Sequence, residues 1–261
     1  MGTRKVWLIG TAMVMALASA CGGGSSESSD STAGTEATTE TTTTPVTDTP
    51  DSTLPPGVTP GLDDLNDDGL PDPICGTGEY GAGLVLQIPC NAPDYAPSAP
   101  EGTTVIPDSV YALPGLTQRE VLADASADAI QAHDPTGKRV VVFFIQSDTL
   151  FELGSATLSN PAQDTLNRLA RAIQAYWPTA TMQVRGHTDA TGSASVNQSL
   201  SEQRAANVAA YLATQGINQS RLSSIGMAST RPIVLETNPD GSDNPAGRTV
   251  NRRVELVVRV P

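Results

Sequence analysis

Apolar and polar positions in the second half of the chain follow two alternating patterns. A continuous apolar run from Val140 to Ile145 predicts a buried strand. Apolar residues then recur at three- and four-residue spacing, which predicts a helix capped by Asn160, with Pro161 in its first turn. Pro178 ends this helix, because proline cannot continue a helical hydrogen-bond ladder.

The remaining elements of this half follow in the same way. A second strand is expected around Val184, and a second helix from about Ser195 to Thr214, with Gly216 as its C-terminal cap. Two more strands are expected at Leu222 to Gly226 and at Val254 to Val260, separated by an irregular stretch. The predicted order is therefore β-α-β-α-β-β.

The stretch before this domain has a helical pattern of its own. Thr117, with Glu120 three residues later, forms a capping box, and a stripe of apolar residues follows. We expect a helix from Thr117 to His133. Together with its connection to the domain, this helix accounts for residues 116–138. The domain itself is expected to span residues 139–261.

The first residues carry the pattern of an export signal. Arg4 and Lys5 precede an apolar run that is shorter than the roughly 20 residues a bilayer span needs. The run ends in small residues directly before Cys21, which resembles a lipobox. We expect a lipoprotein signal peptide over residues 1–20 and a lipid anchor on Cys21. An ordinary cleaved signal beside an incidental cysteine is the alternative.

A polar linker and an acidic run come next. Residues 21–56 are mostly Thr, Ser, Glu, Asp and Pro, and such a composition predicts a disordered linker, because too little apolar surface can be buried. In the acidic run that follows, side chains with oxygen atoms occupy alternate positions, an arrangement that suits a calcium-binding loop. The run resembles thrombospondin type-3 and EF-hand-like loops, although it lacks the distal glutamate, and an acidic turn is the alternative. The candidate ligands are Asp64, Asn66, Asp68 and Asp72.

Two further cysteines, Cys75 and Cys90, remain once Cys21 is assigned to the lipid. An even pair in an oxidising export compartment predicts a disulfide. A metal site is the poorer alternative, since neither histidine has ligand spacing to them. Leu84 to Ile88 predicts a short strand between the two cysteines, so residues 57–115 contain a small disulfide-stapled segment for which the sequence indicates no role.

Four sequence blocks of the C-terminal domain carry a recognisable motif. Phe151-Glu152-Leu153-Gly154-Ser155-Ala156 comes first, and Gly186-His187-Thr188-Asp189 follows a strand. Leu200-Ser201-Glu202-Gln203-Arg204-Ala205 lies on the second helix, and Asn251-Arg252-Arg253-Val254-Glu255 opens the last strand. Together they resemble the OmpA C-terminal domain family, shared with Pal and the periplasmic domain of MotB, over roughly the last 120 residues. The resemblance implies an α+β fold, a two-layer sandwich of helices on a mixed sheet.

The resemblance also implies a ligand. The family binds the peptide stem of peptidoglycan, especially meso-diaminopimelate, whose side chain ends in an ammonium and a carboxylate on one carbon. By the family pattern, Asp189 takes the ammonium and Arg204 the carboxylate. Thr191 and Asn197 line the pocket, and Arg252 contributes from the last block.

Elementary chemistry is consistent with these roles. The planar guanidinium of Arg204 can grip a carboxylate with two hydrogen bonds. Asn197, Ser201 and Arg204 are spaced by four and three residues, so they share one helix face. Backbone N–H groups near Ala190 to Gly192 are expected to add anion contacts at the approach to the helix.

Simpler interpretations exist for each residue taken alone. Asp189 could cap a turn, and Arg204 could be a solvated helix residue. His187 is expected to be structural rather than catalytic. Arg248 and Arg253 are candidates for internal ion pairs rather than for ligand contacts.

Charge and composition narrow the function further. A net charge of -13 disfavours nucleic acid as a partner. The sequence contains no nucleophile elbow, zinc-spaced histidine pair or convincing catalytic carboxylate pair, so we expect a binding protein, not an enzyme. The favoured function is a lipid-anchored envelope protein that tethers membrane to peptidoglycan, at the outer membrane facing the periplasm or on the extracytoplasmic face of a monoderm membrane. The alternative is a calcium-dependent adhesion or scaffold lipoprotein acting through residues 57–115, and calcium is the one cofactor that the sequence suggests.

Overall fold

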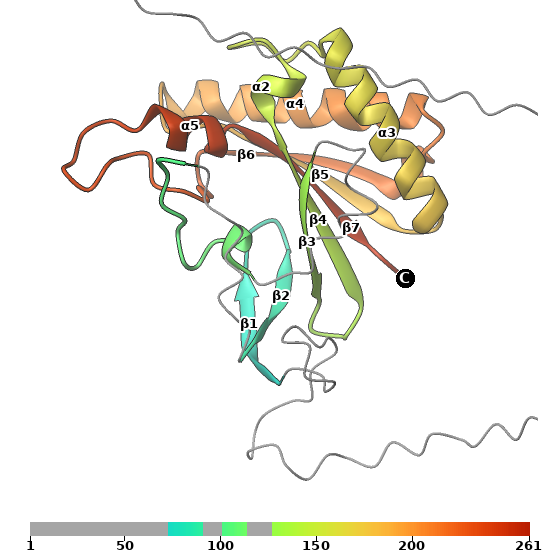
Figure 1. Cartoon of the computed structure of the whole chain (residues 1–261). Coiled ribbons are helices and arrows are strands. Elements are labelled where there is room, and N and C mark those ends of the chain that lie inside the picture. Colours follow the sequence, from blue (N-terminus) through green and yellow to red (C-terminus); the bar gives the residue numbers. More distant parts are fainter. Residues whose placement is uncertain (1–72, 91–100, 114–126) are drawn as a thin grey trace, which may run out of the picture. The chain divides into compact units, whose positions relative to one another are not determined.

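The computed structural model describes residues 73–90, 101–113 and 127–261 (Figure 1). In these ranges no helix combines the length and the hydropathy that a membrane crossing requires. The expected signal peptide of residues 1–20 and the linker of residues 21–56 lie outside the described residues. So do the predicted sites Cys21, Asp64, Asn66, Asp68 and Asp72.

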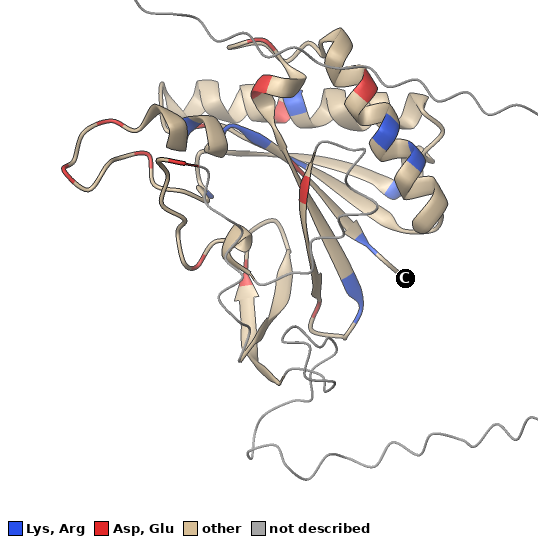
Figure 2. Ribbon diagram, viewed as in Figure 1, with Lys and Arg blue, Asp and Glu red and all other residues tan. Residues whose placement is uncertain are grey.

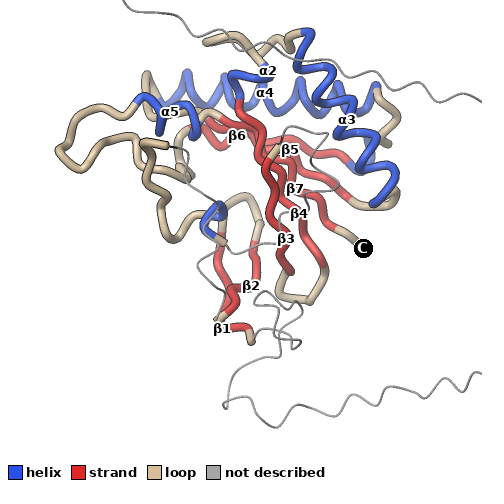
Figure 3. The backbone as a smooth tube through the Cα atoms, in the orientation of Figure 1, coloured by secondary structure: helices blue, strands red, loops and turns tan. Residues whose placement is uncertain are grey.

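A five-stranded mixed sheet with the order β3-β4-β7-β5-β6 forms the centre of the fold (Figure 3). β5 and β6 are parallel, whereas the other neighbouring strands are antiparallel. The predicted α+β fold with helices on a mixed sheet is confirmed. The strands are β3 (Asp128–His133), β4 (Arg139–Gln146), β5 (Thr181–His187), β6 (Leu222–Ala228) and β7 (Arg253–Arg259).

Two helices, α3 (Asn160–Tyr176) and α4 (Ala194–Thr214), cover one face of the sheet (Figures 1 and 3). The cap of α3 is Ser159, whose hydroxyl accepts from the N–H of Ala162, so the cap lies one residue before the expected Asn160. Alternate strand residues meet apolar helix residues in a fully buried core, because a strand presents every second side chain to one face. Its members include Val141, Phe143, Ile145, Leu166, Leu169, Ile173, Val208, Leu212, Val254 and Leu256.

Glycines allow α4 to approach the sheet very closely. A Cβ atom added to Gly186 in β5 would overlap the carbonyl oxygen of Ser201, and one on Gly226 in β6 would lie 2.6 Å from the Ser201 hydroxyl. Larger residues at these two positions would push the helix away. The glycines therefore set the distance between α4 and the end of β5.

The second face of the sheet is covered by the segment that precedes the domain. It consists of the hairpin β1 (Ile74–Glu79) and β2 (Val85–Pro89), and of the short 3-10 helix η1 (Val110–Ala112). Tyr111 packs edge-on against Phe144 of β4, with ring centroids 5.1 Å apart. A second apolar core joins the two layers and includes Leu84, Leu86, Val110, Ile130, Val140, Val142 and Val257.

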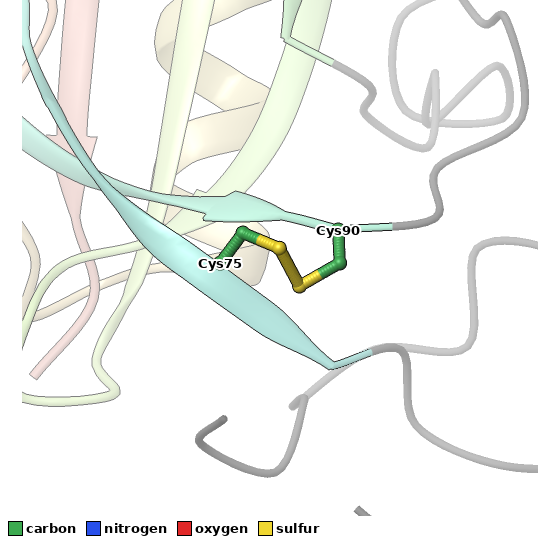
Figure 4. Close-up of a disulfide and its surroundings, with 2 residues drawn as sticks. All are labelled: Cys75 and Cys90. Atoms are coloured by element: carbon green, nitrogen blue, oxygen red, sulfur yellow. A yellow bond between two sulfur atoms is a disulfide. The ribbon is translucent and has the colours of Figure 1, made fainter. Parts of the chain in front are cut away.

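The predicted disulfide between Cys75 and Cys90 is confirmed (Figure 4). It joins β1 to the residue that follows β2, at the open end of the hairpin. The expected strand Leu84 to Ile88 corresponds to β2. The described part of residues 57–115, for which the sequence indicated no role, thus packs on the sheet as a cover.

The expected helix from Thr117 to His133 is wrong over its described part. Residues 128–133 form β3, an edge strand that pairs with β4 from Asp128 opposite Phe144 to His133 opposite Arg139. Pairing with the adjacent strand outweighs the helical stripe. The sheet consequently begins within residues 116–138, before the expected boundary at residue 139.

Among the described residues, β1 and η1 were not predicted, and neither were three short elements within residues 139–261. They are α2 (Ser147–Leu150), the 3-10 helix η2 (Gln219–Arg221) and α5 (Pro245–Asn251). α5 lies within the stretch expected to be irregular, and the Asn244 side chain caps it by accepting from the N–H of Gly247. Both α2 and α5 lead directly to the candidate site.

Candidate functional site

Four charged side chains meet at one end of the sheet, and we call them the open cluster. Asp148 lies in the first turn of α2, Asp189 follows β5, Arg204 projects from α4, and Arg252 precedes β7. Figure 2 shows acidic positions in α2 and basic positions at the start of β7, which α2 contacts. Residues from distant parts of the sequence therefore form one electrostatic unit.

The carboxylate of Asp189 is held by the loop that follows β5. Its Oδ1 accepts from the backbone N–H of Thr191 at 2.9 Å and also from the Thr191 hydroxyl. The amide of Asn197 donates to the carbonyls of Asp189 and Thr191, at 3.2 and 3.0 Å, so Asn197 fixes the loop. Burial alone would raise the pKa of Asp189, but hydrogen bonds from Thr191 and Arg252 lower it, so the group is ionised at neutral pH.

Arg252 bridges both carboxylates of the cluster. Its Nε and Nη2 reach the two oxygens of Asp148 at 3.1 and 2.7 Å, and its Nη1 reaches Oδ2 of Asp189 at 2.8 Å. Nη2 also donates to the hydroxyl of Thr249. The hydrogen bonds to Asp148, followed by those to Asp189, raise the pKa of Arg252.

Arg204 is bound very differently. Its side chain is 2% exposed, its guanidinium lies over the ring of Phe151 at 5.1 Å, and its Nε donates to the carbonyl of Ser155 at 2.8 Å. Its Nη1 is buried without a hydrogen-bond partner, and among the described residues no carboxylate is within ion-pair distance. Burial lowers the pKa of Arg204, whereas Asp148 and Asp189 favour its charged form.

A pocket of about 490 Å³ opens beside the cluster. Asp148 and Arg252 supply its charged wall, and Phe151 supplies an apolar wall. Glu152, Leu153 and Ser159 complete the lining, and Leu153 is 85% exposed. A ligand in this pocket would meet the ring on which Arg204 is stacked.

The expected anion contact at the Ala190 backbone N–H is wrong. This N–H already donates to both carboxylate oxygens of Glu236, at 3.0 and 3.2 Å. Glu236 is itself held by the amide of Asn251 at 2.8 Å. The Thr191 N–H is likewise occupied by Asp189, so these backbone groups position the loop instead of a ligand.

A second group of charges, the closed cluster, is buried under the hairpin. It consists of Arg185, His187, Arg253 and Glu255. Arg185 and Arg253 donate to opposite oxygens of Glu255, and Arg185 also donates to the carbonyls of Tyr80 and of Gly81 in the hairpin turn.

Histidine and the two candidate ion-pair arginines occupy structural positions. His187 is buried, with Nε2 3.3 Å from Glu255, and burial lowers its pKa to about 4. Arg253 pairs with Glu255, and Arg248 pairs with Asp243, as anticipated. The buried position of His187 therefore agrees with a structural role. The polar group beside its ring is the carboxylate of Glu255.

Of the five residues predicted as a ligand site, the structure joins Asp189, Thr191, Asn197 and Arg252 by hydrogen bonds. The fifth, Arg204, lies within electrostatic range of Asp189 and Arg252. Two residues of the site were missed, Asp148 and Glu236. Asp148 follows the first strand within four residues of the Phe151 block, which was the available signal. Glu236 lies in the irregular stretch and carried no signal.

Comparisons with known proteins agree on the region involved. Residues 150–245 match the model of the OmpA family. A probable lipoprotein of Escherichia coli, YiaD, is 33% identical over 118 residues, which are 45% of this chain and 51% of YiaD. The peptidoglycan-binding protein ArfA of Mycobacterium tuberculosis is 39% identical over 103 residues, which are 40% of this chain and 29% of ArfA.

A third relative shows that the shared region occurs in unlike proteins. The photosystem I P700 chlorophyll a apoprotein A2 of Gloeobacter violaceus is 37% identical over 119 residues, or 46% of this chain and 14% of that protein. The chain thus spans about half or less of the length of these relatives. The similarity therefore applies to a domain and not to the whole protein.

Proposed function

We propose, from the premise that the C-terminal domain of this chain belongs to the OmpA family, that the protein is a cell-envelope protein that binds peptidoglycan non-covalently. The proposed ligand is the stem peptide, at a diaminopimelate-type residue. The proposed function is binding and not catalysis. It is supported by the similarity to ArfA and YiaD and by the geometry of the open cluster.

The buried and unpaired guanidinium of Arg204 is the observation that carries this proposal. A buried cation without a carboxylate is costly, and a ligand carboxylate would relieve that cost. Arg204 lies within electrostatic range of Asp189, whose lowered pKa keeps it anionic. One unpaired cation beside one anion matches the ammonium and carboxylate that diaminopimelate carries on a single carbon.

Each predicted residue has a part in this proposal. Arg204 binds the carboxylate and Asp189 accepts hydrogen bonds from the ammonium. Thr191 and Asn197 hold the loop on which Asp189 lies. Arg252 forms the wall of the pocket and is paired with both aspartates, so we assign it a supporting contact.

A membrane anchor would complete the tether. A few charge-assisted hydrogen bonds, less the cost of association, correspond to an affinity on the order of micromolar to millimolar. A lipid on Cys21 and a linker over residues 21–56 would confine the domain near a polymer with many sites, which raises the effective concentration. We accordingly propose a location in the envelope, at the outer membrane facing the periplasm or on the outer side of a monoderm membrane.

Co-sedimentation with purified sacculi tests the proposal. The wild-type chain should be retained, and Asp189→Ala and Arg204→Ala should each lower retention by at least about ten-fold, since each removes one charge-assisted contact. Asp164→Ala, at an exposed position of α3, is the matched control and should bind normally. Equal retention of the folded variants would overturn the site, and release of soluble wall fragments would overturn the non-enzymatic assignment.

A further inference from the structure

We propose that Asp148 determines the charge selectivity of the site, so that it accepts a zwitterion and rejects a simple anion. This inference rests on the proposed function and goes beyond it, because it identifies a residue outside the predicted ligand set. Asp148 would act by controlling Arg252. This inference is based on the ion pairs that Arg252 forms with both Asp148 and Asp189.

The hydrogen bonds of Arg252 leave it no pair of free N–H groups for a bidentate contact with a ligand. Asp148 takes Nε and Nη2, and the remaining Nη1 is directed to Asp189. The position of Asp148 is itself fixed, because the N–H of Ser147 donates to the Arg252 carbonyl at 2.8 Å and holds α2 against the start of β7. The carboxylate of Asp148 is 40% exposed and lines the pocket, so it is within reach of a ligand.

Charge balance gives Asp148 its effect. With Asp148 present, Arg252 shares one positive charge between two carboxylates, and Asp189 keeps part of its negative charge for an ammonium. Without Asp148, the charge of Arg252 would cancel that of Asp189, and Arg204 would remain as an uncompensated cation. The site would then favour a carboxylate and gain nothing from an ammonium.

Other charged groups nearby do not replace Asp148. Glu236 is committed to the Ala190 N–H and to Asn251. Glu152 also lines the pocket, but among the described ion pairs it has none with Arg252. Among the residues that the structure describes, only Asp148 and Asp189 form ion pairs with Arg252.

The test compares two competitors for the release of the full-length protein from sacculi. Meso-diaminopimelic acid carries both ammonium and carboxylate groups, whereas pimelic acid has the same carbon chain and carboxylates without the amines. The wild type should be released by meso-diaminopimelic acid at a concentration at least about ten-fold lower than that of pimelic acid. Asp148→Asn should reduce this preference to about three-fold or less.

Controls separate charge from folding. Asp148→Glu retains the charge and should retain most of the preference, whereas Asp148→Ser, a second neutral variant, should lose it. Asp164→Asn makes the same charge change at an exposed position of α3 and should behave as wild type. Thermal unfolding of each variant shows whether the fold is intact, and Asp148→Ser decides the question if Asp148→Asn is unfolded.

The outcomes distinguish this inference from the proposed function. If the wild type is retained and released selectively, but both neutral variants keep the wild-type preference, then the role of Asp148 is overturned and the proposed function stands. If the wild type is not retained by sacculi, or meso-diaminopimelic acid does not release it, then the proposed function fails and this inference fails with it.

Discussion

The open and closed clusters contain similar side chains but treat them in opposite ways. In the closed cluster, Glu255 is fully buried and each of its oxygens accepts from an arginine. In the open cluster, Arg204 is equally buried but has one hydrogen bond, to a carbonyl. Adjacent residues supply both clusters, since Arg252 joins the open one and Arg253 the closed one.

The difference separates stability from binding. Charges that satisfy one another hold elements together, and the closed cluster holds the hairpin through Arg185 and the carbonyl of Tyr80. A buried charge that lacks its partner costs the fold stability and retains its capacity for a ligand. Variants in the closed cluster should therefore affect unfolding, and variants in the open cluster should affect binding.

Glu255→Gln should cause the largest effect. It leaves Arg185 and Arg253 buried without an anion, and breaking a buried pair in this way costs about 3–5 kcal/mol of unfolding free energy. Urea denaturation measures the loss, with Glu101→Gln at an exposed position as the control. A loss below about 1 kcal/mol would show that the closed cluster does not stabilise the fold.

Acidification should weaken the fold through His187. Its pKa is about 4 in the folded protein and about 6.5 when unfolded, so the unfolded chain binds the proton first as the pH falls. The stability contributed by neutral His187 is thus complete above pH 6.5 and is lost progressively down to about pH 4, by up to about 3 kcal/mol. Asp189 is affected only at lower pH, because its folded pKa lies below 3.8.

Urea denaturation at several pH values between 7 and 4 measures this loss. His187→Gln, which cannot titrate, should flatten the dependence in this window, provided that it folds. An unchanged slope in this variant would assign the pH dependence to other groups.

Gly186→Ala should have an intermediate effect on stability. The added methyl overlaps the carbonyl of Ser201 and forces α4 away from β5, at a cost of roughly 1–3 kcal/mol. Since α4 carries Arg204 and β5 leads to Asp189, binding to sacculi should fall as well. Gly76→Ala is the control, because a Cβ there would have no atom within 4 Å. Equal unfolding midpoints for the two variants would contradict the close approach.

Arg204→Met should have the smallest effect on stability. It loses the hydrogen bond to Ser155 but also removes a buried unpaired charge, and the thioether can pack on Phe151, so the net change should stay within about 1 kcal/mol. Binding to sacculi should nevertheless be lost. Arg253→Met is the comparison and should cost several times more, because Glu255 loses a partner. Similar costs for the two variants would remove the distinction between the clusters.

Local patterns in the sequence were sufficient to predict the elements whose structure depends mainly on their own residues. The apolar run of β4 and the stripe of α3 predicted both elements, and the family blocks located Asp189 and Arg204 correctly on loop and helix. The disulfide followed from cysteine count and compartment. In each case the information lies within a short stretch or in a fixed spacing.

Tertiary contacts decided the features that the sequence did not reveal. The strand β3 depends on pairing with β4, and its sequence also fits a helical stripe. Asp148 meets Arg252 across 104 residues, and Glu236 reaches Ala190 across 46. The pair Asn244-Pro245, at the beginning of α5, is typical of a helix start. The helix is so short that this signal was not recognised in the sequence.

The position of the disulfide has a mechanical consequence. Cys75 and Cys90 join the open end of the hairpin, and 15 positions separate them along the chain. Tension entering before β1 and leaving after β2 would pass through the sulfur–sulfur bond and bypass both strands. The hairpin would then carry no pulling force itself. Its turn would keep the hydrogen bond from Arg185 while the chain on either side is stretched.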